Sequence, residues 1–449
     1  MIMAALLALA SCSAPSGDEA TPPASGGEDE LTSVRNETAW ARGTRWTYES
    51  AFLGFPHAWV YRPEGFSKKS PEQRGVVFHL TGCGEVAYQV AQGSGWPAAA
   101  DEHGLVIVVP ETIAPAHPNT AAPNTACYNF GSTFAPVSRF SRDHAAIIRA
   151  GEDIVTKLPE LKIDPRQIYL TGFSAGGTVA MQVACMAPHV FSGVAPVAGI
   201  SIGMDQNTAV FPPSLISPQV AAICSGYAAT SGRFDAWTRL AEQSYLIVSD
   251  DNALPPGVPV RDDKGQWTLS MFGDQQYWDG DKYVSLMHHT VTANAMSMLF
   301  SASKTDANVE IGLAGRGKGC PGGEASKDDR GEVRCLFTAG TERSWKAKAD
   351  IYKDRDGFVR VQHIRQDTLA HRWPAGPKGP LDHLVTPSLV DIVAAGYVTA
   401  DGQFDQAKVV KAPNGTLALA FFAYDSFSLP KTFAEFFDTN NVRLSRPSP

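Results

Sequence analysis

The feature that most constrains the fold of this chain is a serine set between glycines, in the run Gly172-Phe-Ser174-Ala-Gly176. Residues 167–171 before it form an apolar run typical of a buried strand, and residues 175–186 after it are small and apolar, as in a buried helix. Glycines on both sides permit a strained backbone and close packing of strand on helix. A serine on such a strand–turn–helix is exposed above the sheet, which predicts that Ser174 is a nucleophile.

Strand and helix patterns alternate along the first 200 residues. Strands are predicted near residues 45–48, 58–61, 75–80, 105–110 and 194–198, and helices near 96–102 and 142–158. The continuous apolar runs indicate strands that are buried on both faces, as in a parallel sheet covered by helices. The predicted fold class is therefore α/β, an α/β-hydrolase with a mostly parallel central sheet and helices on both faces.

The second half of the chain is less regular. Three segments rich in proline, glycine and polar residues are interpreted as irregular insertions, namely 203–240, 313–345 and 376–425. Between and after them, strands are predicted at 267–272 and 358–364, and helices at 284–300 and 429–437.

A serine nucleophile needs a histidine base, and the histidine needs a carboxylate that fixes its tautomer. In this fold the acid and then the base follow the serine along the chain, each on a loop after a strand. Of eleven histidines, His371 is the favoured base because it follows the strand predicted at 358–364, and His383 is the alternative. Three aspartates that the pattern does not separate follow the preceding predicted strand: Asp274, Asp279 and Asp281.

The N-terminal residues indicate export. Residues 1–10 are apolar and lead into Leu9-Ala10-Ser11-Cys12, which resembles a bacterial lipobox, although no Lys or Arg precedes the apolar run. Residues 1–12 are predicted to be a lipoprotein signal peptide with lipidation at Cys12, and an ordinary signal peptide is the alternative. Residues 13–39 read as a flexible linker and 40–449 as the catalytic domain. We expect a protein of the cell envelope or extracellular space, held at a membrane by its lipid.

The other six cysteines agree with export, because an even number in an oxidising compartment suggests disulfides. Cys320 and Cys335 bracket a glycine-rich, charged loop and are a candidate pair, whereas buried free thiols are the alternative. The absence of a Cys-x-x-Cys pair argues against a structural zinc site. With a net charge of −8 and no block of basic residues, nucleic acid is not an expected partner.

Several motifs resemble, in order, those of the polyhydroxybutyrate depolymerases and the related feruloyl and acetylxylan esterases. Leu80-Thr-Gly82-Cys83 resembles that family's Leu-His-Gly-Cys loop, and Cys127-Tyr-Asn-Phe its Cys-Trp-Asn-Trp. Residues 163–177 resemble the family signature around the serine, and His371-Arg-Trp373-Pro its His-x-Trp-Pro. The similarity covers roughly residues 55–200, with thin islands further on.

The resemblance implies more specific roles. Asp281-Lys-Tyr-Val284 resembles the family's Asp-x-x-Val, which favours Asp281 as the acid. A Cys83–Cys127 disulfide is implied, as is an oxyanion hole made by the backbone N–H groups of Cys83 and Ala175. The chain departs from the family at Thr81, in place of histidine, and at Glu85, in place of glutamine. Three aromatic residues are candidates either for substrate binding or for the core: Trp96, Tyr128 and Trp373.

These observations predict a secreted serine hydrolase of carboxylic esters that forms an acyl-enzyme and needs no cofactor or metal. The leading substrate is a hydroxyalkanoate polyester or its oligomers, although no polymer-binding module is visible in the sequence. A feruloyl or acetyl ester of plant polysaccharide is the alternative substrate. A binding lipoprotein that kept the fold without the chemistry is the alternative from another class.

Overall fold

The computed structural model describes residues 46–63, 65–83, 85, 87–111, 127–131, 136–204, 213–251, 259–261, 267–269, 284, 286–310, 324–327, 333–337, 341–343, 347–366, 369, 373–374, 422–423 and 428–445. All of them belong to one compact unit, Arg35–Pro449. The predicted signal peptide, linker and Cys12 lie outside the described residues. None of the helices in these ranges is long and apolar enough to cross a membrane.

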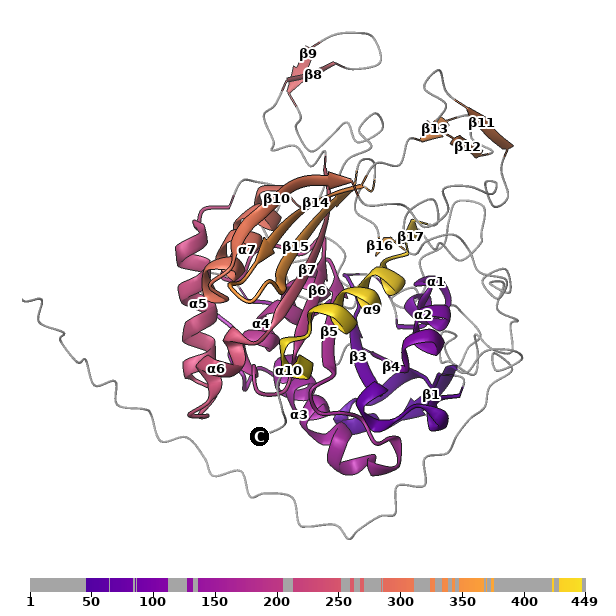
Figure 1. Ribbon diagram of the computed structural model, residues 1–449, viewed down its shortest axis with the longest axis vertical. Coiled ribbons are helices and arrows are strands. Elements are labelled where there is room, and N and C mark those ends of the chain that lie inside the picture. The colour runs from indigo at the N-terminus through magenta and orange to yellow at the C-terminus, as the bar shows by residue number, and fades with distance from the viewer. Residues whose placement is uncertain are drawn as a thin grey trace, which may run out of the picture. The chain divides into compact units, whose positions relative to one another are not determined.

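A ten-stranded sheet runs through this unit in the order β1-β2-β4-β3-β5-β6-β7-β15-β14-β10 (Figure 1). From β4 to β15 all neighbouring strands are parallel, and the two strands at each edge are antiparallel to their neighbours. The strands are β1 (Trp46–Ser50), β2 (His57–Tyr61), β3 (Gly75–Leu80), β4 (Leu105–Pro110), β5 (Ile168–Phe173), β6 (Gly193–Val197), β7 (Ser244–Asp250), β10 (Ser303–Glu310), β14 (Ala347–Lys353) and β15 (Val359–Gln366).

The helices complete the α/β arrangement. They are α1 (Ala87–Gly93), α2 (Trp96–His103), α3 (Arg142–Lys157), α4 (Ala175–Met186), α5 (Ser217–Ala229), α6 (Ala236–Ala241), α7 (Leu286–Leu299), α9 (Leu429–Asn440) and α10 (Val442–Ser445). Short 3-10 helices occur at η2 (Phe52–Gly54), η3 (Phe66–Lys68), η4 (Pro71–Gln73) and η5 (Pro159–Leu161).

Alternate residues of the central strands point into two separate hydrophobic cores. On β3, Val76 and Phe78 belong to the core that contains residues of α3, α4, α5 and α7, whereas Val77 belongs to the core with α1, α2 and α9. The same alternation holds along β7, where Ile247 and Val248 lie in different cores. Because successive side chains of a strand point to opposite faces, helices cover both faces of the sheet, as the sequence predicts.

The elements predicted up to residue 200 are all present, with ends shifted by one or two residues. The later predictions at 284–300, 358–364 and 429–437 correspond to α7, β15 and α9 and are also confirmed. Strands β10 and β14 were not predicted. They extend the sheet beyond β15, and the side chains of β10 are exposed along its whole length, so no apolar periodicity marks it.

The strand predicted at 267–272 is present at 267–269, but outside the main sheet. Trp267–Leu269 (β9) pairs with Pro259–Arg261 (β8) in a separate two-stranded sheet and does not belong to the main sheet. The position beside β15 is taken by β7, whose residues are all buried. β7 escaped prediction because its apolar run, Tyr245–Val248, is short and follows a segment interpreted as an insertion.

The three proposed insertions differ in content. Segment 203–240 contains α5 and most of α6, and α5 packs against α4 and α7. Within 313–345, the strands β11 (Glu324–Lys327), β12 (Val333–Phe337) and β13 (Thr341–Arg343) form a sheet of their own. Within 376–425, only β17 (Phe422–Ala423) is described, and it pairs with β16 (Trp373–Pro374).

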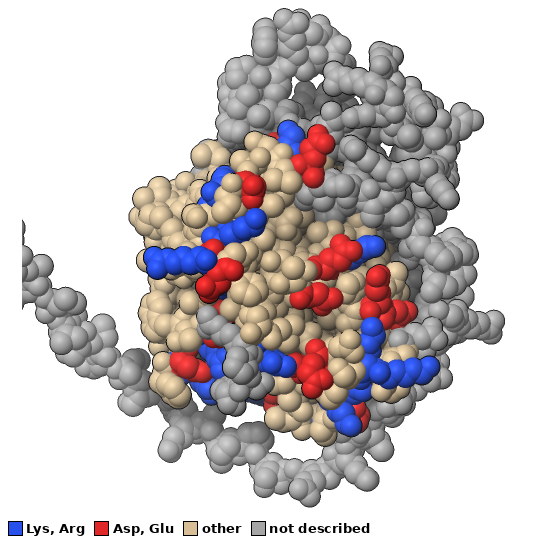
Figure 2. Space-filling view, in the orientation of Figure 1, with Lys and Arg blue, Asp and Glu red and all other residues tan. Residues whose placement is uncertain are grey.

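Acidic and basic side chains are interspersed on the face shown in Figure 2. Ion pairs of the described residues include Arg365 with Asp251 at 2.7 Å and Lys304 with Asp350 at 2.8 Å. Exposed pairs of this kind stabilise a fold only slightly. On this face the described residues present no block of one sign of charge that would favour a polyanion.

Candidate active site

Ser174 lies at the turn between β5 and α4 with a strained backbone. Its φ of 53° and ψ of −120° are rare for a residue other than glycine. The turn is held because the Ser174 N–H donates to the Val197 carbonyl of β6 at 2.8 Å and the Thr178 N–H donates to the Ser174 carbonyl at 3.1 Å. A strained serine at the carboxyl end of a parallel strand is the geometry of a nucleophile elbow.

Two glycines make this turn possible. A Cβ on Gly172 would lie 2.5 Å from the backbone of Gly176, and a Cβ on Gly176 would lie 2.3 Å from the carbonyl oxygen of Leu80. Neither distance is tolerable, because the atoms met are backbone atoms that cannot swing away. The pattern around the serine is thus a packing requirement between β3, β5 and α4.

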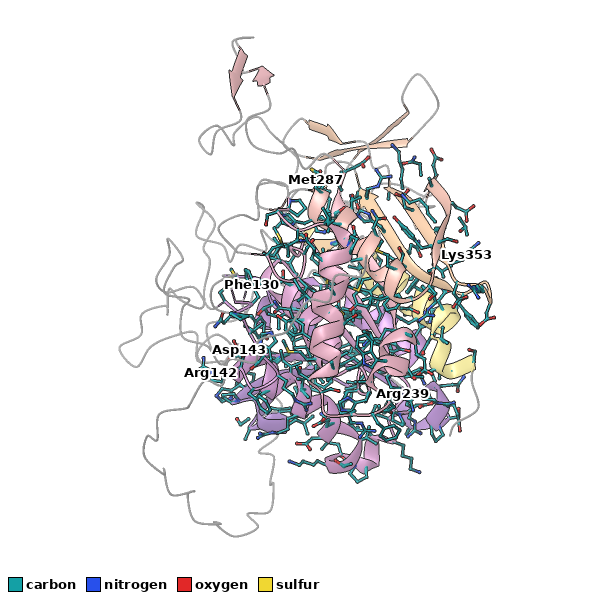
Figure 3. The ribbon with its side chains drawn as sticks, turned by 90° about the vertical axis from the view of Figure 1, so that its left-hand side faces the viewer. Phe130, Arg142, Asp143, Arg239, Met287 and Lys353 are labelled. Atoms are coloured by element: carbon teal, nitrogen blue, oxygen red, sulfur yellow. A yellow bond between two sulfur atoms is a disulfide. The ribbon has the colours of Figure 1, made fainter. Side chains whose placement is uncertain are left out.

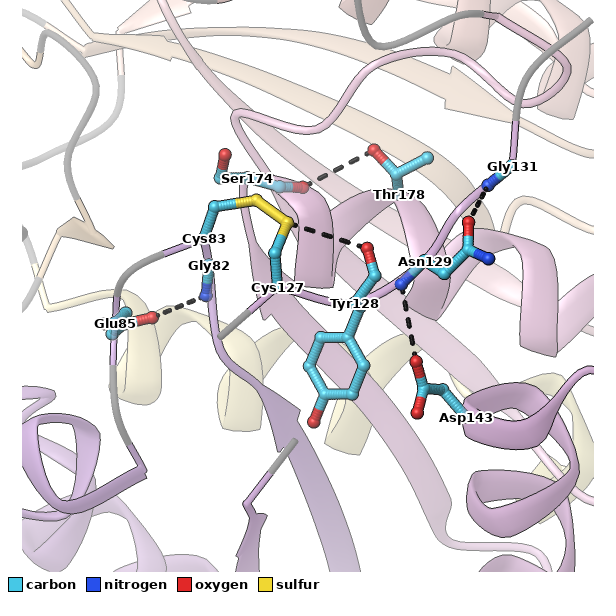
Figure 4. Close-up of a disulfide and its surroundings, with 10 residues drawn as sticks. All are labelled: Gly82, Cys83, Glu85, Cys127, Tyr128, Asn129, Gly131, Asp143, Ser174 and Thr178. Carbon is cyan, nitrogen blue, oxygen red and sulfur yellow. Dashed lines mark hydrogen bonds between the residues drawn. A yellow bond between two sulfur atoms is a disulfide. The ribbon is translucent and has the colours of Figure 1, made fainter. Parts of the chain in front are cut away.

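A disulfide lies beside the serine, as Figure 4 shows. It joins Cys83 to Cys127, the pairing that the family resemblance implied. Gly82 packs on the strand that carries the serine, since a Cβ on it would lie 2.7 Å from the ring of Phe173. The loop after β3 is therefore tied at one end to β5 and at the other to the segment that contains Cys127.

The segment 127–131 is in turn anchored to two helices. The Asn129 N–H donates to the Asp143 carboxylate at the start of α3, at 3.4 Å, and the Gln182 side chain of α4 donates to the Phe130 carbonyl at 2.9 Å. Figure 3 shows Phe130 above the start of α3, where Arg142 and Asp143 are labelled. The disulfide thus connects the loop after β3 to a rigid part of the fold.

The two residues proposed for the oxyanion hole come from different elements. Ala175 is the first residue of α4, so its N–H is among those that have no partner within the helix. Cys83 is half-buried at the loop after β3 and lies near Ser174 in Figure 4. A helix N-terminus favours the negative charge that develops in ester hydrolysis.

The three candidate binding aromatics are core residues in this structure. Trp96 and Trp373 are fully buried and Tyr128 is 1% exposed. Their polar atoms face inward: Trp96 Nε1 donates to His79 Nδ1 at 2.9 Å, Trp373 Nε1 to the Ser94 carbonyl at 3.0 Å, and the Tyr128 hydroxyl to the Pro110 carbonyl at 3.4 Å. This burial favours the core alternative for all three residues.

The proposed base and acid, His371 and Asp281, lie outside the described residues, as do His383, Asp274 and Asp279. Cys320 does too, so its pairing with Cys335 of β12 is not described. The described neighbours of His371 are informative: β15 ends at Gln366, and Leu369 and Trp373 on either side of His371 are buried. Because β15 is parallel to β5 within the sheet, the chain leaves β15 at the same edge as Ser174.

The structure adds one acidic residue that sequence reasoning missed. Asp250 is the last residue of β7, is fully buried, and lies opposite Gln366 of β15. It lies at the carboxyl end of β7, the parallel neighbour of β15, where the acid is expected in this fold. The available signal was the run Tyr245-Leu-Ile-Val-Ser-Asp, a buried strand that ends in a carboxylate. Asp251, by contrast, forms an ion pair with Arg365.

Other buried histidines are held neutral. Burial lowers the pKa of His79 and of His363 to about 3 and that of His144 to about 4. His363, in β15, shares a hydrogen bond of 2.9 Å with the Ser249 hydroxyl of β7. Within the described residues, no group of three or more His, Cys, Asp or Glu side chains could hold a metal ion.

A parallel sheet in this strand order, covered by helices on both faces and carrying a strained serine at a strand–helix turn, defines an α/β-hydrolase. Residues 59–211, from β2 to the loop after β6, match the family described as Esterase PHB depolymerase. The chain has the α/β-hydrolase fold, and residues 59–211 are similar to that esterase family.

Individual relatives agree with this placement. A poly(3-hydroxybutyrate) depolymerase from Ralstonia pickettii is 24% identical over 350 residues, which are 76% of this chain and 56% of that protein. An acetylxylan esterase from Coprinopsis cinerea is 26% identical over 156 residues, 34% of this chain and 38% of that protein. This chain thus spans little more than half of the first relative and less of the second.

Among solved structures, an acetyl xylan esterase from Aspergillus awamori matches with a TM-score of 0.44 and 13% identity, over 70% of this chain and 88% of that one.

Proposed function

We propose that the protein is a serine carboxylic-ester hydrolase that cleaves hydroxyalkanoate polyesters or their oligomers. The observation that carries this proposal is the strained backbone of Ser174 beside a disulfide-tied loop. A strained residue costs on the order of 1–3 kcal/mol and persists where function requires it. A binding protein of the same fold would have no use for that strain, which argues against the alternative of a non-catalytic lipoprotein.

The proposed mechanism gives each candidate residue one role. Ser174 Oγ attacks the ester carbonyl while His371 takes its proton, and Asp281 orients the imidazole and stabilises its cation. The N–H groups of Cys83 and Ala175 bind the oxyanion. The alcohol leaves with the proton from His371, and water then releases the acid from the acyl-enzyme by the same steps. Each oxyanion donor contributes roughly 3–4 kcal/mol to stabilisation of the transition state.

The choice of polyester as substrate rests on the relatives. The relative from Ralstonia pickettii, matched over most of this chain, is a poly(3-hydroxybutyrate) depolymerase, and the family match covers the elbow and the loop after β3. The acetylxylan esterase supports a second candidate, an acetyl ester of plant polysaccharide. The shared chemistry is hydrolysis of a carboxylic ester, so the two candidates differ in the substrate and not in the site.

Export to the cell envelope, with lipidation at Cys12, is part of the proposal. Two disulfides, Cys83–Cys127 and Cys185–Cys224, support it, because such bonds persist in oxidising compartments.

Hydrolysis of p-nitrophenyl esters from acetate to octanoate tests the proposal, with wild type, Ser174→Ala and Ser67→Ala, a change at an exposed serine. We expect Ser174→Ala to lose at least about a thousandfold in kcat and Ser67→Ala to match wild type. Clearing of a polyhydroxybutyrate film and release of acetate from acetylxylan then separate the two substrates. Ester hydrolysis that survives in Ser174→Ala would contradict the mechanism.

A further inference from the structure

The turn that carries Cys83 is closed on itself by a single residue, Glu85. The Gly82 N–H donates to Glu85 Oε2 at 2.8 Å (Figure 4). The Glu85 N–H donates to the Gly82 carbonyl at 3.2 Å. The side chain and the backbone of Glu85 therefore both form hydrogen bonds with Gly82. The Gly82 carbonyl and the Cys83 N–H belong to one peptide group. The two bonds to Gly82 therefore hold the orientation of the Cys83 N–H.

The Glu85 carboxyl lies in a setting that does not suit a charge. The residue is 1% exposed, and its second oxygen, Oε1, is buried without a hydrogen-bond partner. No Lys or Arg of the described residues offsets the cost of its burial. An ionised carboxylate with one hydrogen bond and no cation is expensive in such a place, whereas a neutral carboxyl is tolerated.

The charge of Glu85 also matters for the reaction that we propose. Negative charge develops on the substrate oxygen that the Cys83 N–H binds, and Glu85 is only two residues away from Cys83 in the same closed turn. A second negative charge there would oppose the first, because like charges repel strongly in a site with little water. A neutral Glu85 keeps the turn closed without that repulsion.

We propose that Glu85 is a positioning residue of the oxyanion loop and that the enzyme works with this carboxyl protonated. The proton resides on Oε1, because Oε2 accepts the Gly82 N–H. Glu85 acts through Cys83 and does not touch the substrate. The inference rests on the esterase function proposed above and adds to it a residue that sets how activity depends on pH.

The surrounding titratable groups are consistent with a neutral carboxyl. Burial raises the pKa of Glu85 to about 8, against a smaller lowering by the Gly82 N–H. Burial also raises the pKa of the Tyr128 phenol, which interacts with Glu85, Asp143 and Glu111 and bonds to Thr81. On β3, His79 remains neutral because burial lowers its pKa to about 3. These neighbours are neutral or negative, so they favour the protonated form of Glu85.

The test compares pH profiles of kcat and KM from pH 5 to 10 for wild type, Glu85→Gln, Glu85→Leu and Glu160→Gln, a control at an exposed glutamate. Glutamine has the shape of the neutral carboxyl and can accept the Gly82 N–H, but it does not ionise. We expect wild type and Glu160→Gln to lose activity as the pH rises through about 8. Glu85→Gln should retain neutral activity to within about twofold and lose this alkaline decline.

Glu85→Leu removes the acceptor for Gly82 and should lower kcat at least about tenfold with KM changed less than about twofold. Circular dichroism and melting temperatures show whether the variants fold. If Glu85→Leu does not fold, the pH profile of Glu85→Gln alone decides the test. An alkaline decline that persists unchanged in Glu85→Gln would overturn the proposal. If wild type and all variants neither hydrolysed esters nor reacted with fluorophosphonate, the proposed esterase function would be contradicted. The proposed role of Glu85 would then be contradicted as well.

Discussion

The chain from β1 to the loop after β6 and the chain beyond it build their parts of the site differently. In the first region the loop after β3 and the elbow at Ser174 pack so closely that a Cβ added to Gly172 or Gly176 would lie 2.5 Å or less from backbone atoms. The Cys83–Cys127 disulfide ties the same loop to residues 127–131. In the second region, β7 and β15 lie side by side in the sheet but are separated in sequence by more than a hundred residues. The proposed nucleophile is thus specified locally, whereas the proposed base and acid follow strands that lie far apart in the sequence.

The most damaging change in the second region should be at the base. We expect His371→Ala to lower kcat for p-nitrophenyl butyrate by about a thousandfold or more, because Ser174 would lose the group that takes its proton. His383→Ala is the matched control and should retain activity. If His383→Ala lost activity and His371→Ala retained it, the base would be His383, contrary to our proposal.

The acid offers a sharper test of the same region. Asp281→Asn should lower kcat by about a hundredfold or more, since the imidazole would lose its tautomer and its partner. Asp250→Asn, at the end of β7, is the paired variant. We expect Asp250→Asn to lower the melting temperature, because a buried carboxylate is lost. We expect it to retain a higher kcat than Asp281→Asn. If Asp250→Asn lowered kcat more than Asp281→Asn, the acid would be Asp250, at the end of β7 beside β15.

Substitutions at glycine positions test the packing of the first region, from β1 to the loop after β6. Gly176→Ala places a Cβ 2.3 Å from the Leu80 carbonyl oxygen, so we expect destabilisation by several kcal/mol, on the scale of overpacking, together with loss of activity. Gly226→Ala, in helix α5 with nothing within 4 Å of the added atom, should instead stabilise the protein by about 0.5–1 kcal/mol. Thermal unfolding of both variants measures the difference, and a tolerated Gly176→Ala would contradict the interlocked turn.

The same contrast explains how much the sequence predicted. The fold class, the strands up to residue 200 and the elbow at Ser174 follow from local patterns, because buried parallel strands and glycine-dependent turns leave clear signals. β7 was missed and β9 was misplaced in the sheet, because a four-residue apolar run is ambiguous and the order of strands is a long-range property. The Cys185–Cys224 disulfide, which joins α4 to α5, was not predicted since connectivity is not deducible from cysteine spacing.

Burial was another property that the sequence could not supply. Trp96 and Trp373 fit an aromatic binding surface as well as a core, and only their packing around His79 assigns them to the core. Glu85 reads as one more polar loop residue until the structure shows its carboxyl buried against Gly82.

The central claim is that Ser174 is an activated nucleophile, and covalent labelling tests it most directly. Wild type, Ser174→Ala and His371→Ala would be treated with a fluorophosphonate, and the modified peptide identified by mass spectrometry. Our account predicts one adduct on Ser174 in wild type, none in Ser174→Ala and much slower labelling in His371→Ala. A folded wild-type protein that stays unlabelled, or an adduct on another residue, would contradict it.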